Sequence, residues 1–220
     1  MPDAVGIIMD GNRRWAKAHG LLSMDGHKHG FEKLKEVARW AREAGVRELT
    51  VYAFSTENWN RSEAEVSYLM QLLEHVLSEG LQELEEDGIC IRFIGESERF
   101  SPMFRRKMQG VEARTKGNGR STLIIALSYG GRAEILDAAR KLAGKEVTED
   151  SLKEAMWSKG LLDPDLIIRT GGEMRLSNFL TWGSAYSELM FTDTLWPDFE
   201  KEELLSMLAE FQKRERRMGK

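Results

Sequence analysis

The chain has 220 residues, of which 41% are hydrophobic and 31% are charged, a composition typical of a soluble globular protein with a large core. Its formal net charge of −4 argues against a general nucleic-acid-binding surface, although it does not exclude a local basic site. No apolar run approaches the roughly 20 residues of a membrane-spanning helix, the first residues are not those of a secretory signal, and the single cysteine indicates a reducing compartment. We therefore expect one cytoplasmic domain over residues 1–220, with at most peripheral membrane contact.

Strands and helices are predicted to alternate along the whole chain. Apolar, β-branched and aromatic residues predict strands at residues 5–9, 49–54, 89–94, 122–127, 165–168 and 188–191. The spacing of apolar residues predicts a short helix from residue 13 and further helices at 31–44, 66–84, 104–115, 133–142, 149–159 and 201–216. Residues 23–30, with two glycines and two histidines, are expected to form a loop. This alternation predicts an α/β fold with a single, mostly parallel central sheet and helices on both faces.

The turn Asp10-Gly11-Asn12 ends the first predicted strand and opens a helix. The exposed N–H groups of a first helical turn and the helix dipole both favour a bound phosphate. The simpler explanation is that Asp10 or Asn12 only caps the helix, which for an isolated turn is at least as common.

Three more polar loops follow predicted strands, at residues 55–61, 129–132 and 169–178. In a parallel sheet such loops lie at the same edge, where ligands of α/β proteins bind. In the last loop Arg169 and Arg175 flank a Gly-Gly pair and Ser177 follows, a combination that suits a diphosphate. Alternatively, the two arginines are surface residues paired with acids such as Glu173.

A carboxylate beside a diphosphate is repulsive unless a cation lies between them. Asp10 therefore implies a divalent ion, which we expect to be Mg²⁺, with Glu188 as a second contributor. The common nucleotide-binding glycine motifs are absent from the sequence. His27 and His29 have no partners at the spacing of a zinc site, which argues against structural zinc.

Six motifs carry a resemblance to a known family; they are residues 9–16, 26–30, 52–61, 129–132, 168–179 and 195–199. Through them the chain resembles the cis-prenyltransferases, which include the undecaprenyl diphosphate synthases, over nearly its whole length. The resemblance implies an enzyme that uses Mg²⁺ to condense an allylic diphosphate with isopentenyl diphosphate. It also implies a homodimer, because the C-terminal R-x-G of the family reaches the partner's site and Arg217-Met218-Gly219 matches it.

The resemblance assigns roles residue by residue. Asp10 would be the metal-linked carboxylate, with Glu188 near the metal. Catalytic positions would be Asp10, His27, Ser55 and Asn58. Substrate-binding positions would be Gly11, Asn12, Arg13, Arg14, Trp15, Trp59, Arg61, Arg169, Arg175, Ser177, Arg217 and Gly219, with Trp59 and Arg61 on a mobile loop. Because the sequence offers no obvious strong base, we hypothesise that a diphosphate oxygen removes the proton, helped by Asn58 and Ser55.

Three positions depart from the family pattern. Ser23 stands where the allylic diphosphate site usually has an arginine, Gly183 stands where glutamine is usual, and the first strand begins Ala4-Val5-Gly6 rather than His-Val-Ala. Three functions therefore compete: a chain-elongating synthase of short product, an irregular lavandulyl-type enzyme that uses dimethylallyl diphosphate as nucleophile, and a non-catalytic partner subunit, which Asp10 argues against. A phosphate-binding regulatory module is the non-enzyme alternative.

An apolar stripe runs along residues 66–84. Core packing explains most stripes of this kind. The functional alternative is the wall of an apolar tunnel, in which the bulky Tyr68 would limit product length.

Overall fold

The computed structural model describes residues 1–119 and 121–214. Its centre is a six-stranded sheet with the strand order β3-β4-β2-β1-β5-β6, in which every pairing is parallel. The strands are β1 Ala4–Ile8, β2 Glu48–Ser55, β3 Cys90–Ile94, β4 Thr122–Tyr129, β5 Leu166–Arg169 and β6 Glu188–Phe191. The prediction of an α/β fold around one parallel sheet is confirmed.

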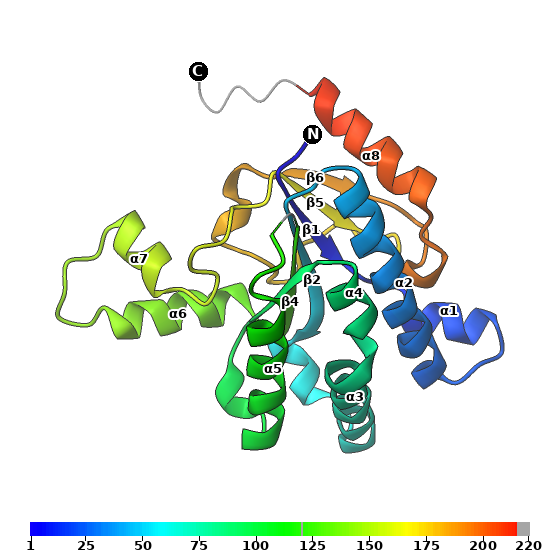
Figure 1. Ribbon diagram of the computed structural model, residues 1–220, viewed down its shortest axis with the longest axis horizontal. Helices are drawn as coiled ribbons and strands as arrows, with labels where there is room; N and C mark the ends of the chain where they lie inside the picture. The colour runs from blue at the N-terminus through cyan, green and yellow to red at the C-terminus, as the bar shows by residue number, and fades with distance from the viewer. Residues whose placement is uncertain (120, 215–220) are drawn as a thin grey trace.

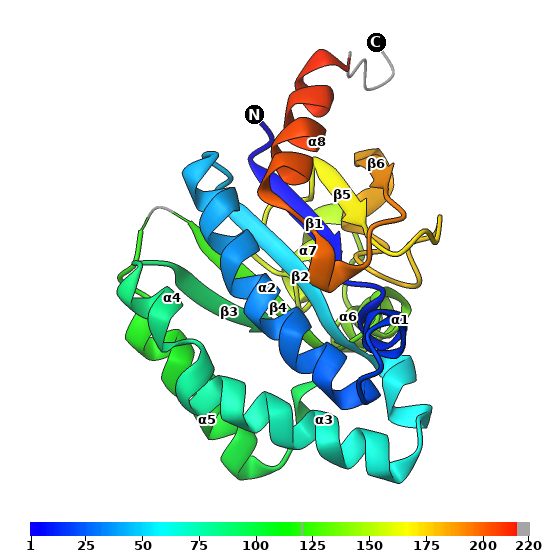
Figure 2. The same ribbon diagram turned by 90° about the vertical axis from the view of Figure 1, so that its right-hand side faces the viewer.

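Helices cover both faces of this sheet (Figures 1 and 2). They are α1 Asn12–Ala18, α2 Ser23–Glu43, α3 Glu63–His75, α4 Gln82–Glu86, α5 Pro102–Thr115, α6 Gly131–Lys141, α7 Glu149–Ala155 and α8 Lys201–Lys213. Figure 2 shows α2, α4 and α5 in one layer in front of the sheet, and Figure 1 shows α6 and α7 as an arm on the other side. None of the helices in the described ranges is long and apolar enough to cross a membrane.

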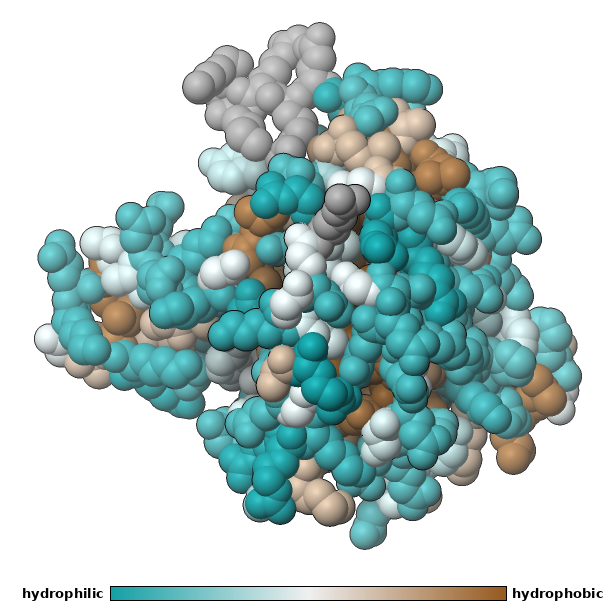
Figure 3. Space-filling view, viewed as in Figure 1, coloured by the Kyte–Doolittle hydropathy of each residue, from teal (hydrophilic) through white to brown (hydrophobic). Residues whose placement is uncertain are grey.

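The alternation of side chains along the strands explains the two layers. Val5 and Ile7 of β1 belong to the larger apolar core, which contains buried residues of α2, α4, α5 and α8, whereas Ile8 belongs to a smaller core on the opposite face. Successive side chains of a strand point to opposite faces, so a strand buried on both faces is apolar throughout. The outer surface is mainly hydrophilic in the view of Figure 3.

Residues 23–30 are helical, so the expectation of a loop is wrong. Gly26 and Gly30 belong to α2 and are places of close approach rather than turns. A Cβ atom on Gly26 would lie 2.1 Å from the Asn12 carbonyl oxygen, and one on Gly30 would lie 2.0 Å from Asn12 Oδ1. The two glycines therefore let the first half of α2 pack directly against the start of α1.

The predicted helix at residues 66–84 is interrupted. A π-helical turn, Val76–Gly80, separates α3 from α4. Such turns are rare and are often found at functional sites. The predicted helix at 149–159 ends earlier, at Ala155, and the part of 201–216 that the structure describes is helical to Lys213.

Candidate active site

The turn after β1 presents Asp10 at the carboxyl edge of the sheet. Gly11 has a φ of +113°, in the left-handed region, and a Cβ atom there would lie 2.9 Å from Leu195 Cδ2. Gly11 itself occupies the N-cap position of α1, and no side chain caps this helix. The simpler explanation for Asp10 and Asn12 therefore fails, because neither side chain serves as the cap.

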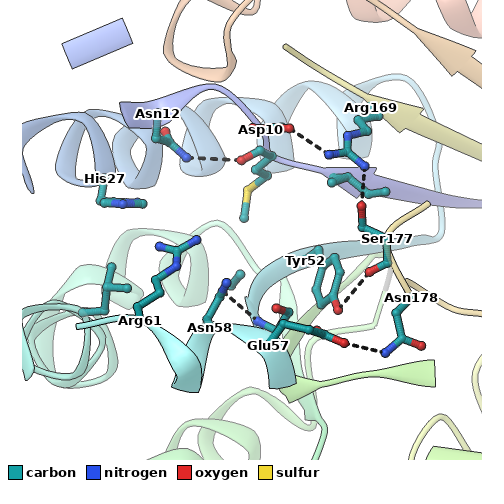
Figure 4. A pocket seen from close by; sticks show the side chains of 15 residues that line it. Asp10, Asn12, His27, Tyr52, Glu57, Asn58, Arg61, Arg169, Ser177 and Asn178 are labelled. Atoms are coloured by element: carbon teal, nitrogen blue, oxygen red, sulfur yellow. Dashed lines mark hydrogen bonds and ion pairs between the residues drawn. The ribbon is translucent and has the colours of Figure 1, made fainter. Parts of the chain in front are cut away.

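A cavity of about 580 Å³ lies where the loops after β1, β2 and β5 meet; we call it the central cavity (Figure 4). Its lining residues are Ile8, Met9, Asp10, Asn12, His27, Tyr52, Ala53, Ser55, Glu57, Asn58, Arg61, Leu69, Arg169, Ser177 and Asn178. Three of the four predicted loops thus converge. The fourth, at residues 129–132, supports the site from outside: the Arg132 backbone N–H donates to Asn178 Oδ1 at 2.9 Å.

The Arg169 guanidinium has hydrogen-bonding partners on several sides of the central cavity. Its side chain is only 5% exposed, and its Nη2 donates to Asp10 Oδ2 at 2.9 Å. Its Nη1 donates to Ser177 Oγ at 2.8 Å and to the Arg175 carbonyl oxygen at 2.6 Å. Arg14 Nη2 lies 3.3 Å from the other carboxylate oxygen of Asp10. Asp10 is therefore held between two guanidinium groups.

Several buried polar atoms near the central cavity have no hydrogen-bond partner. In the described ranges there are three such side-chain atoms, Asn12 Oδ1, His27 Nε2 and Arg169 Nε, and all belong to residues that line the central cavity. A buried polar group without a hydrogen bond is costly, so native proteins usually satisfy it with protein, water or ligand. Asn12 Oδ1 faces Gly30 of α2, whereas His27 Nε2 and Arg169 Nε are the nitrogen atoms of the set.

A second cavity of about 240 Å³ adjoins the first and is lined by Arg13, Arg14 and Arg61; we call it the arginine cavity. It shares Asp10 and His27 with the central cavity. The cavity lining contains three guanidinium groups and the Asp10 carboxylate, and Glu65 pairs with Arg13 and Arg61 beside it. The excess of positive charge favours a multiply charged anion.

His27 lies between the cavities as a neutral group. Burial, with the positive charges of Arg61 and Arg13 acting against Glu65, lowers the pKa of His27 to about 4. At neutral pH its imidazole therefore carries no charge and acts as a hydrogen-bonding group rather than a cation.

An apolar channel of about 80 Å³ continues from the central cavity toward α2 and α3. It shares Met9, Asn12, His27, Ala53 and Leu69 with that cavity. The rest of its lining is Gly30, Phe31, Leu34, Phe54, Leu72, Leu73, Val76 and Trp196. The apolar stripe at residues 66–84 therefore contributes both to the channel wall and to the core. Leu69, Leu73 and Val76 line the channel, and Val76, Leu77 and Leu81 belong to the core.

Two predicted substrate-binding tryptophans lie elsewhere. The Trp15 indole N–H donates to Asp198 Oδ1 at 2.6 Å, and its ring packs against His19 and His29. Trp59 lies in a 3-10 helix, Thr56–Asn60, rather than in a loop, and its N–H donates to Ser128 Oγ at 2.9 Å. Neither ring lines the central cavity, the arginine cavity or the channel. Both are bulky rings that pack next to the site.

Arg175 and Glu188 are also placed differently. The Arg175 guanidinium pairs with Glu173 and is mostly exposed, as the surface-residue alternative predicted, and only its carbonyl oxygen contacts Arg169. Glu188 begins β6 opposite Leu166, at the amino edge of the sheet, and pairs with Arg214 at 2.7 Å. Asp10 follows the carboxyl end of β1, so Glu188 and Asp10 lie at opposite edges of the sheet within one chain. Arg217 and Gly219 lie outside the described residues.

Three polar residues that line the central cavity, Tyr52, Glu57 and Asn178, were missed as site residues by sequence reasoning. Tyr52 OH donates to the Tyr129 carbonyl oxygen at 3.0 Å, and Asn178 Nδ2 donates to Glu57 Oε1 at 2.9 Å. These bonds connect the loops after β2, β4 and β5. The signal for Tyr52 was its position at the end of a predicted strand, and Glu57 and Asn178 stood within the polar loops.

Comparison with known proteins identifies the family. Residues 8–219 match the profile of a family described as "Putative undecaprenyl diphosphate synthase". The chain belongs to this family. It is 46% identical to an isoprenyl transferase of Thermotoga maritima, over 100% of this chain and 97% of that protein, and 44% identical to one of Geobacillus kaustophilus, over 100% and 89%. These relatives, which span the full chain, establish a prenyltransferase.

Two solved structures share the fold. Lavandulyl diphosphate synthase from Lavandula x intermedia, in complex with dimethylallyl diphosphate, has a TM-score of 0.93 and 34% identity, over 100% of this chain and 98% of that one. A probable undecaprenyl diphosphate synthase from Campylobacter jejuni has a TM-score of 0.86 and 33% identity, over 100% and 99%. The chain is thus similar in fold to proteins named for two different prenyl diphosphates, lavandulyl and undecaprenyl diphosphate.

Proposed function

We propose that this prenyltransferase condenses an allylic diphosphate of the dimethylallyl or geranyl class with isopentenyl diphosphate, releases diphosphate and forms a short product. One observation carries the proposal: two cavities with arginine side chains in their lining share Asp10, and a narrow apolar channel opens into the larger one. That arrangement accommodates two diphosphate groups and one short hydrocarbon tail. We further propose that the enzyme acts in the cytoplasm as a homodimer.

The roles of the side chains follow from their positions. Arg13, Arg14 and Arg61 would hold the allylic diphosphate in the arginine cavity, with Gly11 and Asn12 of the adjoining turn. Because α1 has only seven residues, the arginines rather than the helix dipole supply most of the positive charge. Arg169 and Ser177 would hold the second diphosphate in the central cavity.

The chemistry needs little covalent participation by the protein. As the allylic carbon loses its diphosphate, negative charge grows on the leaving group, and the three guanidinium groups stabilise it where it develops. The alkene of isopentenyl diphosphate then attacks that carbon, and a proton leaves. Asn58 Oδ1 accepts the Ser55 backbone N–H at 3.0 Å, which leaves the Asn58 NH₂ group as a donor for a substrate oxygen. We propose that a diphosphate oxygen removes this proton, as hypothesised from the sequence.

The residues present fit one Mg²⁺ that is shared with the substrate. In the described ranges no three acidic, histidine or cysteine side chains form a metal site. Asp10 can supply one carboxylate, and Mg²⁺ usually binds through one or two carboxylates together with substrate phosphates and water. When bound, the ion would neutralise phosphate charge and assist departure of the leaving group.

Irregular head-to-middle coupling is the second candidate. The similarity to lavandulyl diphosphate synthase favours it, and so does Ser23, which is exposed at the first turn of α2 and brings no cation to the allylic site. A non-catalytic partner subunit is disfavoured by Asp10, which is present and bonded to Arg169.

A product assay separates these candidates. Purified protein is incubated with Mg²⁺ and dimethylallyl or geranyl diphosphate, with and without isopentenyl diphosphate, and released diphosphate is measured. Linear products, identified by mass spectrometry and chromatography after dephosphorylation, that need isopentenyl diphosphate support elongation. A branched product from dimethylallyl diphosphate alone supports irregular coupling. No diphosphate release with any combination refutes both.

A further inference from the structure

The loop after β5 holds several residues in an unfavourable backbone conformation. Among the described residues, four besides glycine have a positive φ: Ser128 at +49°, Ser177 at +48°, Asn178 at +68° and Leu180 at +43°. L-residues rarely adopt this conformation, and asparagine tolerates it better than most. Such positions persist where surrounding contacts fix them, and they gather at ligand-binding sites. Ser177 and Asn178 both line the central cavity.

Asn178 caps the start of α6 from a different loop. Helix α6 begins at Gly131, and its N-cap residue, Gly130, has no side chain that could accept the first N–H groups. The Asn178 carbonyl oxygen accepts the Gly131 N–H at 2.8 Å, and Asn178 Oδ1 accepts the Arg132 N–H at 2.9 Å. A Cβ atom on Gly130 would lie 2.8 Å from Asn178 Nδ2, so this glycine makes room for the amide. Capping therefore explains both oxygen atoms of Asn178.

Capping does not explain the amide nitrogen. Asn178 Nδ2 donates to Glu57 Oε1 at 2.9 Å, which joins the loop after β5 to the 3-10 helix Thr56–Asn60 after β2 (Figure 4). Burial opposes ionisation of Glu57, but hydrogen bonds, of which that from Asn178 is the largest, lower its pKa overall. The bond to this carboxylate is therefore charge-assisted at neutral pH. An aspartate would cap α6 at least as well, because negative charge is favoured at a helix N-terminus, so capping alone does not select an amide.

The bond joins the neighbours of two proposed site residues. Glu57 directly precedes Asn58, and Asn178 directly follows Ser177. Ser177 Oγ accepts a hydrogen bond from Arg169 Nη1 at 2.8 Å. The bond between Glu57 and Asn178 thus fixes the distance from Asn58 to Ser177 and Arg169. The lining of the arginine cavity contains no residue of the loop after β5, so this bond acts on one of the two cavities.

We propose that Asn178 is a positioning residue for the second diphosphate: its amide links the α6 cap to Glu57 and keeps Ser177 and Arg169 at the spacing from Asn58 that isopentenyl diphosphate needs. The proposal rests on the proposed function and deepens it. Loss of the link should weaken the use of isopentenyl diphosphate and spare the allylic diphosphate in the arginine cavity. A purely structural residue would instead reduce the amount of active enzyme, which lowers the apparent kcat and leaves both KM values unchanged.

Asn178→Asp tests the link without removing the cap. Aspartate keeps an acceptor for the Arg132 N–H and tolerates the left-handed backbone, but it replaces the donor to Glu57 by a second carboxylate oxygen. Steady-state diphosphate release is measured with Mg²⁺, dimethylallyl diphosphate and isopentenyl diphosphate. The KM for isopentenyl diphosphate should rise at least about tenfold, and the KM for dimethylallyl diphosphate should stay within about twofold of the wild type.

A second substitution reverses the direction of the bond, and a distant asparagine is the control. In the double variant of Asn178→Asp with Glu57→Gln, the new amide donates to the new carboxylate, so the KM for isopentenyl diphosphate should return to within about threefold of the wild type. Asn118 also joins two segments, because its Nδ2 donates to the Glu85 and Ile89 carbonyl oxygens at 3.2 Å, but it lines neither cavity. Asn118→Ala should lower Tm and leave both KM values unchanged.

The outcomes separate the two proposals. If the wild type releases no diphosphate, or needs no isopentenyl diphosphate, the proposed function fails. If the wild type is active and Asn178→Asp keeps the wild-type KM for isopentenyl diphosphate, or raises both KM values equally, the positioning role is overturned. A double variant that recovers nothing overturns the link to Glu57. Should a circular-dichroism melt show that Asn178→Asp does not fold, Asn178→Gly decides, because glycine suits the left-handed backbone and an unchanged KM there also overturns the role.

Discussion

Replacement of Asp10 by asparagine tests the centre of the proposed site. The exchange keeps the size and hydrogen-bonding ability of the side chain but removes the charge that lies between Arg14 and Arg169. If Asp10 links a metal to the diphosphates, loss of that interaction should lower kcat by at least about 1,000-fold, or about 4 kcal/mol of transition-state stabilisation. Steady-state diphosphate release over a range of Mg²⁺ concentrations measures this effect.

The same exchange should change stability only modestly. Arg169 is 5% exposed, but it keeps Ser177 Oγ and the Arg175 carbonyl oxygen as partners, so we expect a loss of about 1–2 kcal/mol. For a chain of this size that corresponds to a fall in Tm of roughly 2–8 °C. Glu173→Gln is the matched control in the same region, since Glu173 pairs with the exposed Arg175 among the described residues, and its turnover should stay within about twofold of the wild type. An Asp10→Asn enzyme with wild-type turnover at saturating Mg²⁺ would refute the metal assignment.

Three further predictions concern the walls of the site. The pKa of His27 is lowered to about 4 from its usual 6.5, so the unfolded chain binds a proton before the folded chain does as pH falls. Urea titrations of the wild type should therefore show about 2 kcal/mol less free energy of unfolding at pH 5 than at pH 7. A His27→Asn variant should not lose this amount, and equal losses in both proteins would contradict the prediction. Gly30→Ala places a Cβ atom 2.0 Å from Asn12 Oδ1, so it should lower the free energy of unfolding by about 1–3 kcal/mol and also lower turnover. Gly110→Ala is the control: its Cβ atom would meet Arg114 at 3.5 Å, so stability and turnover should stay nearly unchanged. Glu65 lies 2.8 Å from Arg61 and 3.5 Å from Arg13. Glu65→Gln should therefore free both arginines and lower the KM for the allylic diphosphate about threefold, which corresponds to about 0.7 kcal/mol of binding free energy. An unchanged or raised KM would argue that these arginines do not bind the allylic diphosphate.

The fold and the position of the site could be predicted because both depend on the order of strands and helices along the chain. Strands that alternate with helices form a parallel sheet, and the loops at its carboxyl edge must lie together. Asp10, Asn58 and Ser177 come from three such loops and do line one cavity. Nothing more than the order of elements was needed to place them there.

The direction of each side chain could not be predicted in the same way. Trp15, Trp59 and Arg175 stand within the right segments, but the rings turn toward other partners and the guanidinium toward Glu173. For Glu188 the direction along the strand decides its position. It starts a strand rather than following one, and residues at the two ends of a parallel strand lie at opposite edges of the sheet.

The glycines of α2 show why a local pattern misled the prediction of a loop and yet marked the site. Glycine usually signals a turn because it lowers helix stability by about 1 kcal/mol relative to alanine. Here Gly26 and Gly30 are needed by packing, since any side chain at either position would collide with Asn12. Their contact brings α2 close enough to the turn after β1 for His27, on the helix between them, to line the same cavities as Asp10. The glycine pair therefore fixes the distance between the two walls of the arginine cavity, and a substitution there should alter diphosphate binding before it alters the rest of the fold.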